Sequence, residues 1–217
     1  MKPLALALAW LLLAAPVVAG APLTAAQTER LKAFHAPLEF TSKGLIKLPL
    51  VKLDRDLLYT FGPVKTDGAM PTVQVSIVDR AHGNKMTKEQ VELTARGTLH
   101  TGDPALVNAC NVAGYDPALL ARLRASEKLI HGRGQMEVSG SIVPIEVTHH
   151  RTGEVADDGS MRVESVIESE NGSAKLTSIT ILAPDGLPWV ADTTGTVAKG
   201  PITIYVTMKL ERQGVPK

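Results

Sequence analysis

A serine at a sharp turn, histidines at close spacing, a cysteine and clustered acids are the side chains here that could do chemistry. A nucleophile elbow requires Gly-x-Ser-x-Gly between a strand and a helix. The nearest match, Val138-Ser139-Gly140-Ser141, lacks the first glycine and lies between two predicted strands. No loop ends in Gly-Lys-Ser/Thr, and His131-Gly132-Arg133-Gly134 precedes a strand rather than a helix. Neither serine-nucleophile chemistry nor nucleotide binding is therefore indicated.

Adjacent histidines could bind zinc or copper, and His149 and His150 are adjacent. They fall on a predicted strand, where consecutive side chains point to opposite faces, so their rings cannot hold one ion without a bulge. The acids crowd turns and one strand face, at Asp157, Asp158, Glu164, Glu168 and Glu170. A solvated acidic face lacks the burial that raises the pKa of a general acid. We expect the protein to bind no metal and no cofactor and not to be an enzyme. A deep pocket that holds two or more of His82, His100 and His131 would change the last expectation.

Cys110 is the only cysteine, so no internal disulfide can form. Its neighbours Ala109, Asn111 and Val112 include no cation or metal partner that would activate a thiolate. We expect a buried or idle thiol, and packing must provide the stability of the chain.

The first 19 residues have the pattern of a secretory signal peptide. Lys2 gives a positive start, residues 4–15 form an unbroken apolar run, and Val17 and Ala19 are the small residues preferred before cleavage. The run is shorter than the roughly 20 apolar residues that a bilayer span requires. We predict cleavage after Ala19, a periplasmic or secreted chain, and no stable membrane span after cleavage.

The chain that remains after cleavage is formally neutral. The 217 residues include 23 Lys and Arg against 22 Asp and Glu, and the predicted signal peptide holds one of the lysines. Because a neutral chain has no basic field for phosphate backbones, we expect no nucleic acid partner. With 44% apolar residues the chain can bury a core, and its length fits a single domain.

Two segments have the start signals of helices. Residues 20–37 begin with the capping box Thr24-x-x-Gln27, which predicts an N-terminal helical segment. Asp116-Pro117 combines an N-cap residue with proline at the first helical position, and it predicts a helix of about three turns.

The other segments alternate apolar and polar residues in the period of strands. Pro71 opens one strand, and Ile202 to Leu210 alternate without exception. Asp157-Asp158-Gly159-Ser160, Asn171-Gly172 and Asp185-Gly186 are typical of the turns that join antiparallel strands. The predicted fold is mainly β, an antiparallel barrel or strongly curved sheet with one or two short helices, in a single domain over residues 38–217.

Two regions are less regular. In Leu45–Phe61, Pro49 lies within an apolar run and Asp54-Arg55-Asp56 interrupts it, which predicts two short strands and a turn, the first strand at a sheet edge. Met86–His100 fits two structures equally. Its capping box and Gly97 favour a helix, and its alternation favours a strand.

The predicted inward faces are aliphatic, because only 4% of the residues are aromatic. Met136, Val138, Ile204, Val206 and Met208 are the residues that we expect to line an interior. Smooth aliphatic walls suit an aliphatic ligand, and the same alternation also describes an ordinary packed core.

Four segments resemble the YceI-like family of exported lipocalin-type proteins: Leu99–Asp103, Tyr115–Leu120, Gln135–Val147 and the terminal strand Ile202–Leu210. The resemblance implies a barrel that holds an isoprenoid or other lipid, with no catalytic residues. A fainter likeness is to the PsbP/Mog1-type sandwich, which a helix at Met86–Arg96 would favour.

Two functions are compatible with these patterns. The first is an exported protein that binds a small hydrophobic, lipid or isoprenoid-like ligand in its aliphatic interior. The second is a non-catalytic cell-envelope accessory protein with a packed core, which binds an unknown protein partner through strand edges such as those marked by Pro49 or Pro144.

Overall fold

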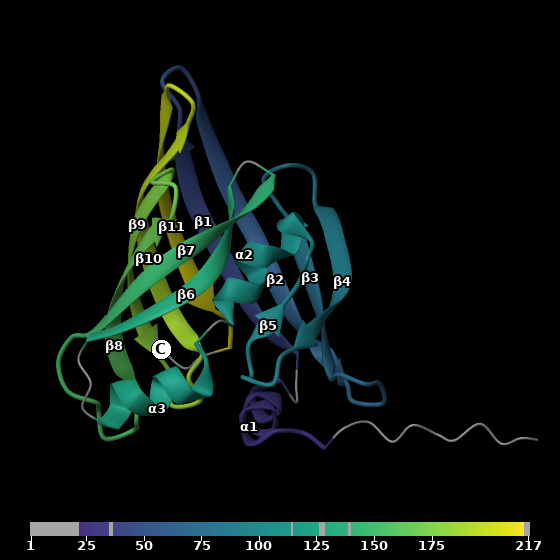
Figure 1. The fold of residues 1–217 in the computed structure, drawn as a ribbon. Helices are drawn as coiled ribbons and strands as arrows, with labels where there is room; N and C mark the ends of the chain where they lie inside the picture. Colours follow the sequence, from purple (N-terminus) through teal and green to yellow (C-terminus); the bar gives the residue numbers. More distant parts are fainter. Residues whose placement is uncertain (1–21, 35–36, 114, 126–128, 139, 215–217) are drawn as a thin grey trace, which may run out of the picture.

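The computed structural model describes residues 22–34, 37–113, 115–125, 129–138 and 140–214, so the predicted signal peptide lies outside the described residues. Three helices and eleven strands follow one another in this part of the chain (Figure 1). They are α1 (Ala25–Ala33), β1 (Leu38–Lys47), β2 (Lys52–Lys65), β3 (Thr72–Asp79), β4 (Lys85–Leu93), β5 (Leu99–His100), α2 (Pro104–Val112), α3 (Pro117–Ala125), β6 (Leu129–Val138), β7 (Ser141–Arg151), β8 (Met161–Ser169), β9 (Ala174–Leu182), β10 (Pro188–Lys199) and β11 (Ile202–Arg212).

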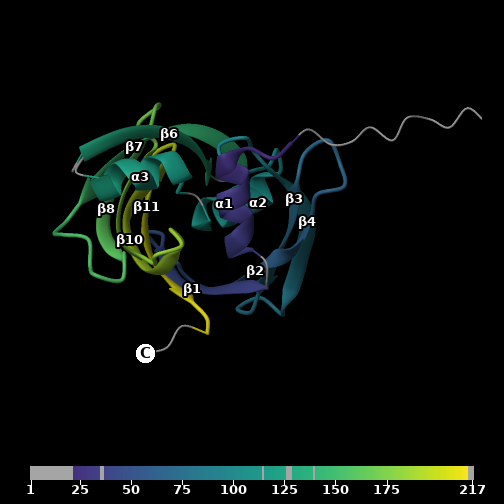
Figure 2. The ribbon, with the colours of Figure 1, turned by 90° about the horizontal axis from the view of Figure 1, so that it is seen from below.

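All eleven strands form one antiparallel sheet in the order β5-β4-β3-β2-β1-β11-β10-β9-β8-β7-β6. The sheet curves around α2, with α1 and α3 at one end of it (Figures 1 and 2), and among the described residues no ladder joins its edge strands β5 and β6. The prediction of a mainly β, strongly curved antiparallel sheet is confirmed. The sheet is not the closed barrel that the YceI-like resemblance implies.

Helix α2 lies in the open seam between the two edges, where it packs against β3, β5, β6 and β7. Two of its asparagines, three residues apart, reach the edge of β6. The Asn111 side chain donates to the Gln135 carbonyl at 2.9 Å, and the Asn108 side chain accepts from the Glu137 amide at 3.4 Å. These side chains bond backbone groups at the edge of β6 that would otherwise be open to pairing with a further strand.

Helices α2 and α3 begin with the same four residues, Asp-Pro-Ala-Leu. Asp103 accepts from the Ala105 amide at 2.9 Å, and Asp116 accepts from the amides of Ala118 and Leu119. Asp103-Pro104 is therefore the same helix-start signal as Asp116-Pro117, although we predicted a helix only after Asp116.

Helix α1 has the predicted capping box, with reciprocal bonds between Thr24 and Gln27. The Gln27 side chain also donates to the Leu93 carbonyl at 2.9 Å, and the buried Arg30 donates to the carbonyls of Gly97 and Tyr115. Helix α1 is thus tied both to the β4–β5 turn and to the segment before α3.

Three sequence expectations need correction. Residues 45–61 belong to two strands, as predicted. The turn between these strands is at residues 48–51, so its predicted place at Asp54-Arg55-Asp56 is wrong. The first of these strands is not at an edge, because β1 pairs with both β2 and β11. Pro49 lies in the turn, where its missing N–H removes no ladder bond.

Pro144 lies on β7, an interior strand of the sheet, at the point where the β7–β8 ladder ends: it pairs with Gln135 of β6, and the ladder to β8 begins at Ile145. The Pro144 carbonyl accepts from the Glu170 amide at the point where β8 ends, so the ladder stops where proline has no N–H to offer. Residues 85–93 form the strand β4 and not a helix, and Gly97 lies in the tight turn to β5 with a φ of 76°. This strand removes the helix that favoured the PsbP/Mog1-type sandwich.

One part of the concave face is densely packed. All the phenylalanines of the chain, Phe34, Phe40 and Phe61, are at most 1% exposed. The ring centroid of Phe61 is 5.9 Å from that of Phe34 and 5.8 Å from that of Phe40. Leu106 and Cys110 of α2 close this core from the other side. In the part of the chain that the structure describes, no helix is both long and apolar enough to cross a bilayer.

Candidate ligand-binding cavity

Much of the remaining concave face borders an open cavity of about 1810 Å³. Residues of β6 to β11 form most of its wall, and residues of the three helices, of β1 to β4 and of the β4–β5 turn complete it. Cavities that take drug-sized ligands measure roughly 300–1,000 Å³. This interior has room for a larger ligand.

All five residues that the sequence analysis selected line this cavity: Met136, Val138, Ile204, Val206 and Met208. Met136 is buried, and the other four are half-buried although they point inward. An inward side chain that remains half-buried borders space that protein atoms do not fill. Their contact with a ligand stays a prediction.

The aliphatic end of the cavity lies toward the β10–β11 turn. Ile145 and Leu176 are buried there, with half-buried valines and isoleucine packed around them at Val138, Val143, Val147, Ile167, Val197 and Val206. Met208 reaches into the same wall across Gly44, where a Cβ would stand 2.9 Å from the Met208 Cγ. Such a wall offers dispersion contacts and no hydrogen bonds, so it suits a hydrocarbon chain.

A row of polar side chains crosses the sheet next to this aliphatic wall. Register places His149 opposite Ser165, Ser165 opposite Ser178, and Ser178 opposite Thr193, on four successive strands. His149 Nδ1 and the Ser165 hydroxyl are 2.9 Å apart, and the Thr193 hydroxyl donates to Ser178 at 3.0 Å. All four residues line the cavity. The cavity is therefore amphipathic, aliphatic toward the β10–β11 turn and polar toward α3.

Tyr115, from the segment between α2 and α3, covers the polar row. Its hydroxyl is 3.2 Å from the Ser165 hydroxyl, and its ring centroid is 5.3 Å from that of His149. Burial raises the pKa of Tyr115, so the phenol stays protonated and can donate. Arg30 bonds the Tyr115 carbonyl, and this contact positions the tyrosine over the row.

Burial lowers the pKa of His149 to about 4. The imidazole is therefore neutral near pH 7, with one nitrogen as a donor and the other as an acceptor. A neutral imidazole, three aliphatic hydroxyls and a phenol offer both donors and acceptors and no net charge. This set can bind an uncharged polar group such as an alcohol, ester or amide.

Sequence reasoning missed the polar row. It considered His149 and His150 only as a pair that cannot hold one ion, whereas the His149 side chain lies half-buried between Tyr115 and Ser165. His150 is exposed on the opposite face, as the strand alternation predicted. Inward serines and threonines at Ser165, Ser178 and Thr193 were visible as polar residues in apolar positions, but only the pairing register brings them together.

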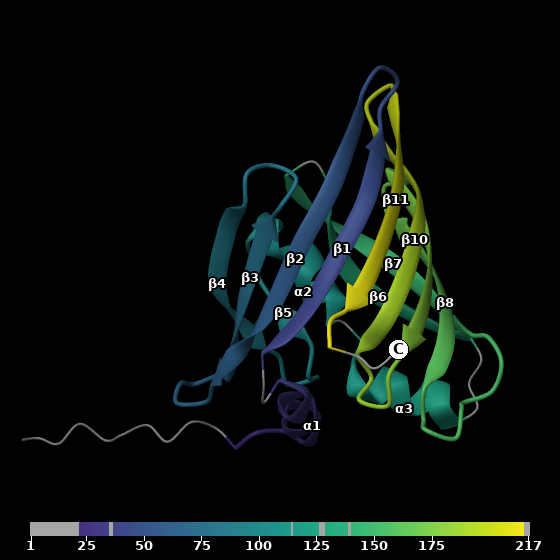
Figure 3. The ribbon, with the colours of Figure 1, turned by 180° about the vertical axis from the view of Figure 1, so that it is seen from behind.

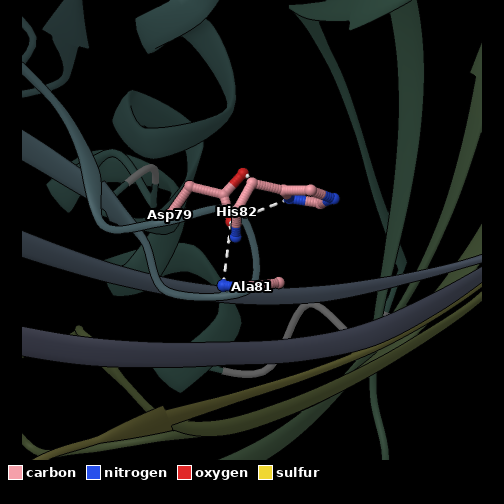
Figure 4. Close-up of polar contacts among 3 residues, drawn as sticks. All are labelled: Asp79, Ala81 and His82. Atoms are coloured by element: carbon pink, nitrogen blue, oxygen red, sulfur yellow. Dashed lines mark hydrogen bonds and ion pairs between the residues drawn. The ribbon is translucent and has the colours of Figure 1, made fainter.

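The other histidines do not gather in the cavity. Of His82, His100 and His131, only His131 lines it. His82 lies at the β3–β4 turn, where Asp79 accepts from its amide, from the Ala81 amide and from its ring at 2.9 Å (Figure 4). Hydrogen bonds from His82 outweigh the effect of desolvation and lower the pKa of Asp79. This exposed pair closes a turn, and among the described residues no group of three His, Cys, Asp or Glu could hold a metal ion.

Cys110 is buried in the packed core on α2, away from the cavity wall. Burial raises the pKa of its thiol to about 12, so the thiolate is not populated at neutral pH. The expected burial of this thiol is confirmed.

Comparisons with known proteins give little further information. No protein-family model matches the sequence, and no curated protein matches it. A solved structure described as an outer membrane lipoprotein-sorting protein domain from Vibrio parahaemolyticus is 10% identical, with 88% of this chain and 92% of that chain covered and a TM-score of 0.25. A DUF1329 family protein from Desulfovibrio piger is 8% identical, with 89% and 95% covered and the same TM-score. At this TM-score neither likeness carries an argument, and the YceI-like family is not shown.

Proposed function

We propose that this protein is exported and binds one small amphiphile, a lipid or isoprenoid-like molecule with an aliphatic chain and an uncharged polar group. The observation behind the proposal is the cavity of about 1810 Å³, whose inward aliphatic residues remain half-buried. In this proposal the aliphatic wall around Val206 and Leu176 contacts the chain, and the half-buried residues His149, Thr193 and Tyr115 bond the polar group.

The size of the hydrophobic term explains how such a site would select its ligand. Each methylene that leaves water contributes about 0.8 kcal/mol, which is roughly a fourfold gain in affinity. Hydrogen bonds to an uncharged group contribute less, and they mainly orient the ligand, because water bonds the same group when it is free. Chain length should therefore dominate affinity until the aliphatic end is full.

Binding without catalysis is part of the proposal. His149 and Ser165 are a base and a hydroxyl at hydrogen-bond distance, but Ser165 is only 2% exposed and the pKa of His149 is near 4. A base with that pKa removes a serine proton poorly at neutral pH. In the described residues no carboxylate bonds His149 to orient it. The alternative function, partner binding with a packed interior, does not fit an interior that contains this cavity.

A chain-length series tests the proposal. Decanol, dodecanol and tetradecanol compete with N-phenyl-1-naphthylamine, whose fluorescence reports apolar binding. We expect affinity to rise about fourfold per methylene. Val206→Trp places a large ring in the cavity and should weaken tetradecanol binding at least about tenfold.

Thr207→Trp is the matched control, because Thr207 is the next residue on β11 and is exposed on the opposite face. It should leave binding unchanged. No uptake of the probe by the wild type, or equal loss in both variants, would overturn the proposed function. Intact mass of the protein from its native source tests export, since cleavage after Ala19 leaves residues 20–217.

A further inference from the structure

Two hairpins project together beyond the rest of the sheet, at the end opposite α1 and α3 (Figures 1 and 3). They are β1–β2 and β10–β11, and they lie side by side because β1 pairs with β11 as far as Lys47 opposite Tyr205. Residues about 150 positions apart in the chain therefore share one surface.

The end of these hairpins is apolar. Leu50 is 96% exposed and Tyr205 is 58% exposed, and the two hairpins carry five of the ten large apolar side chains that are exposed in the described chain. We call this surface the hairpin tip, which consists of Lys47, Leu50, Val51, Lys52, Leu53, Ile202 and Tyr205. Two-residue hairpin turns normally contain Gly, Asn or Asp, whereas this turn contains Pro49 and Leu50. Five exposed apolar side chains grouped at the end of two hairpins indicate a contact surface.

The charged side chains of the hairpin tip are both positive. Lys47 and Lys52 are exposed and directly opposite each other at the end of the β1–β2 ladder, and residues 45–53 and 200–207 contain no Asp or Glu. Like charges in directly opposite positions destabilise a sheet. An anionic surface would relieve this repulsion. Each lysine near such a surface raises the affinity of the protein for it about fivefold.

We propose that the hairpin tip docks on the surface of a lipid bilayer that contains anionic headgroups. Apolar side chains at the extreme end of two narrow hairpins can enter the soft boundary between headgroups and acyl chains, while the lysines remain among the headgroups. A protein partner of ordinary affinity requires a broad surface of about 800 Å² on each side, which two hairpin ends do not provide. Tyr205 suits the same boundary, because tyrosine has an apolar ring and a polar end.

Docking would bring the aliphatic end of the cavity next to the bilayer. Ile46 and Ile204 line the cavity, and they lie within three residues of the tip residues Lys47 and Ile202 on the same strands. The docking surface and the cavity wall use different side chains, so docking does not depend on a bound ligand and each can be tested alone.

Co-sedimentation with vesicles tests the proposal. Wild-type protein is mixed with phosphatidylcholine vesicles that contain about a quarter phosphatidylglycerol, and with phosphatidylcholine alone. We expect binding to the anionic vesicles that weakens as ionic strength rises from about 0.05 to about 0.5 M. Leu50→Glu should weaken this binding at least about tenfold, and the charge-removing double variant K47Q/K52Q should remove most of its dependence on salt.

Leu129→Glu is the matched control, because Leu129 is also an exposed leucine, 57% exposed, and it starts β6 far from the tip. It should bind vesicles like the wild type. Equal binding of Leu50→Glu and Leu129→Glu, absence of wild-type binding, or crosslinking of the tip to a protein with no vesicle binding would each overturn the proposal. Leu50→Glu should bind tetradecanol normally, so a failure of docking and a failure of the proposed function are distinguishable.

Discussion

The concave face of the sheet contains two regions of opposite character. In the packed region, formed by β1 to β5 with α1 and α2, Phe40, Phe61 and Leu106 are fully buried. In the hollow region, on β6 to β11 beyond a buried cluster that includes Leu123 and Val163 beneath α3, Val206 and Met208 also point inward but remain half-buried around the cavity.

Helix α2 is the boundary between the two regions. Its apolar face, with Leu106 and Cys110, fills the packed region, and its asparagines Asn108 and Asn111 bond the edge of β6. The chain also divides its residue types, because all its phenylalanines are in the packed region and the end of the cavity toward the β10–β11 turn is aliphatic. A sheet that is too wide for one helix to fill is thus closely packed in one region and leaves a cavity in the other.

The largest predicted effect concerns core truncation. Phe61→Ala removes a fully buried ring that contacts Phe34 and Phe40, and it should lower the free energy of unfolding by about 4 kcal/mol. Val206→Ala, on the cavity wall, should cost about 1 kcal/mol because fewer protein contacts are lost. Urea unfolding measures both. Similar losses in the two variants would show that the hollow region is as well packed as the other.

The second prediction is a pH dependence that belongs to the hollow region. The pKa of His149 falls to about 4 in the folded chain from an ordinary 6.5, so between these values the unfolded chain binds a proton that the folded chain does not. Stability from this residue is complete above pH 6.5 and is lost as the pH falls toward 4. The loss should be about 2 kcal/mol, after allowance for the half-buried position of the ring.

His149→Gln provides the comparison, because glutamine keeps hydrogen-bonding groups and does not titrate. Urea unfolding of both proteins at several pH values between 6.5 and 4 should show a steeper decline in the wild type. Parallel declines would mean that water reaches the imidazole freely and that the polar row is not buried.

The smallest predicted effect on stability concerns helix α2, the boundary between the two regions. Asn111→Ala removes the 2.9 Å bond to the Gln135 carbonyl and should cost about 1 kcal/mol. Asn108→Ala should cost less, since its two contacts with Glu137 are 3.4 and 3.5 Å long. No loss of stability in either variant, measured by urea unfolding, would mean that α2 is held at the seam by its apolar face alone.

Local signals in the sequence predicted much of the secondary structure. The capping box at Thr24, Asp116-Pro117 before α3, and the Asp-Gly and Asn-Gly turns around β8 and β9 act through neighbouring residues, so a single sequence contains them. The residues 85–93 fit a helix equally well by local criteria. Pairing with β3 over eight residue pairs makes them a strand, and that pairing partner is not a local property.

The sequence by itself determined a mainly β chain with one aliphatic and one polar face on most strands. Only the tertiary structure decided that the aliphatic face of β11 borders a cavity, because the same alternation produces a packed core when a helix covers it. Only the register of β7 to β10 assembled His149, Ser165, Ser178 and Thr193 into one row. Hydrogen bonds between neighbouring strands set that register over long sequence separations, whereas periodicity determines no more than the face on which each side chain lies.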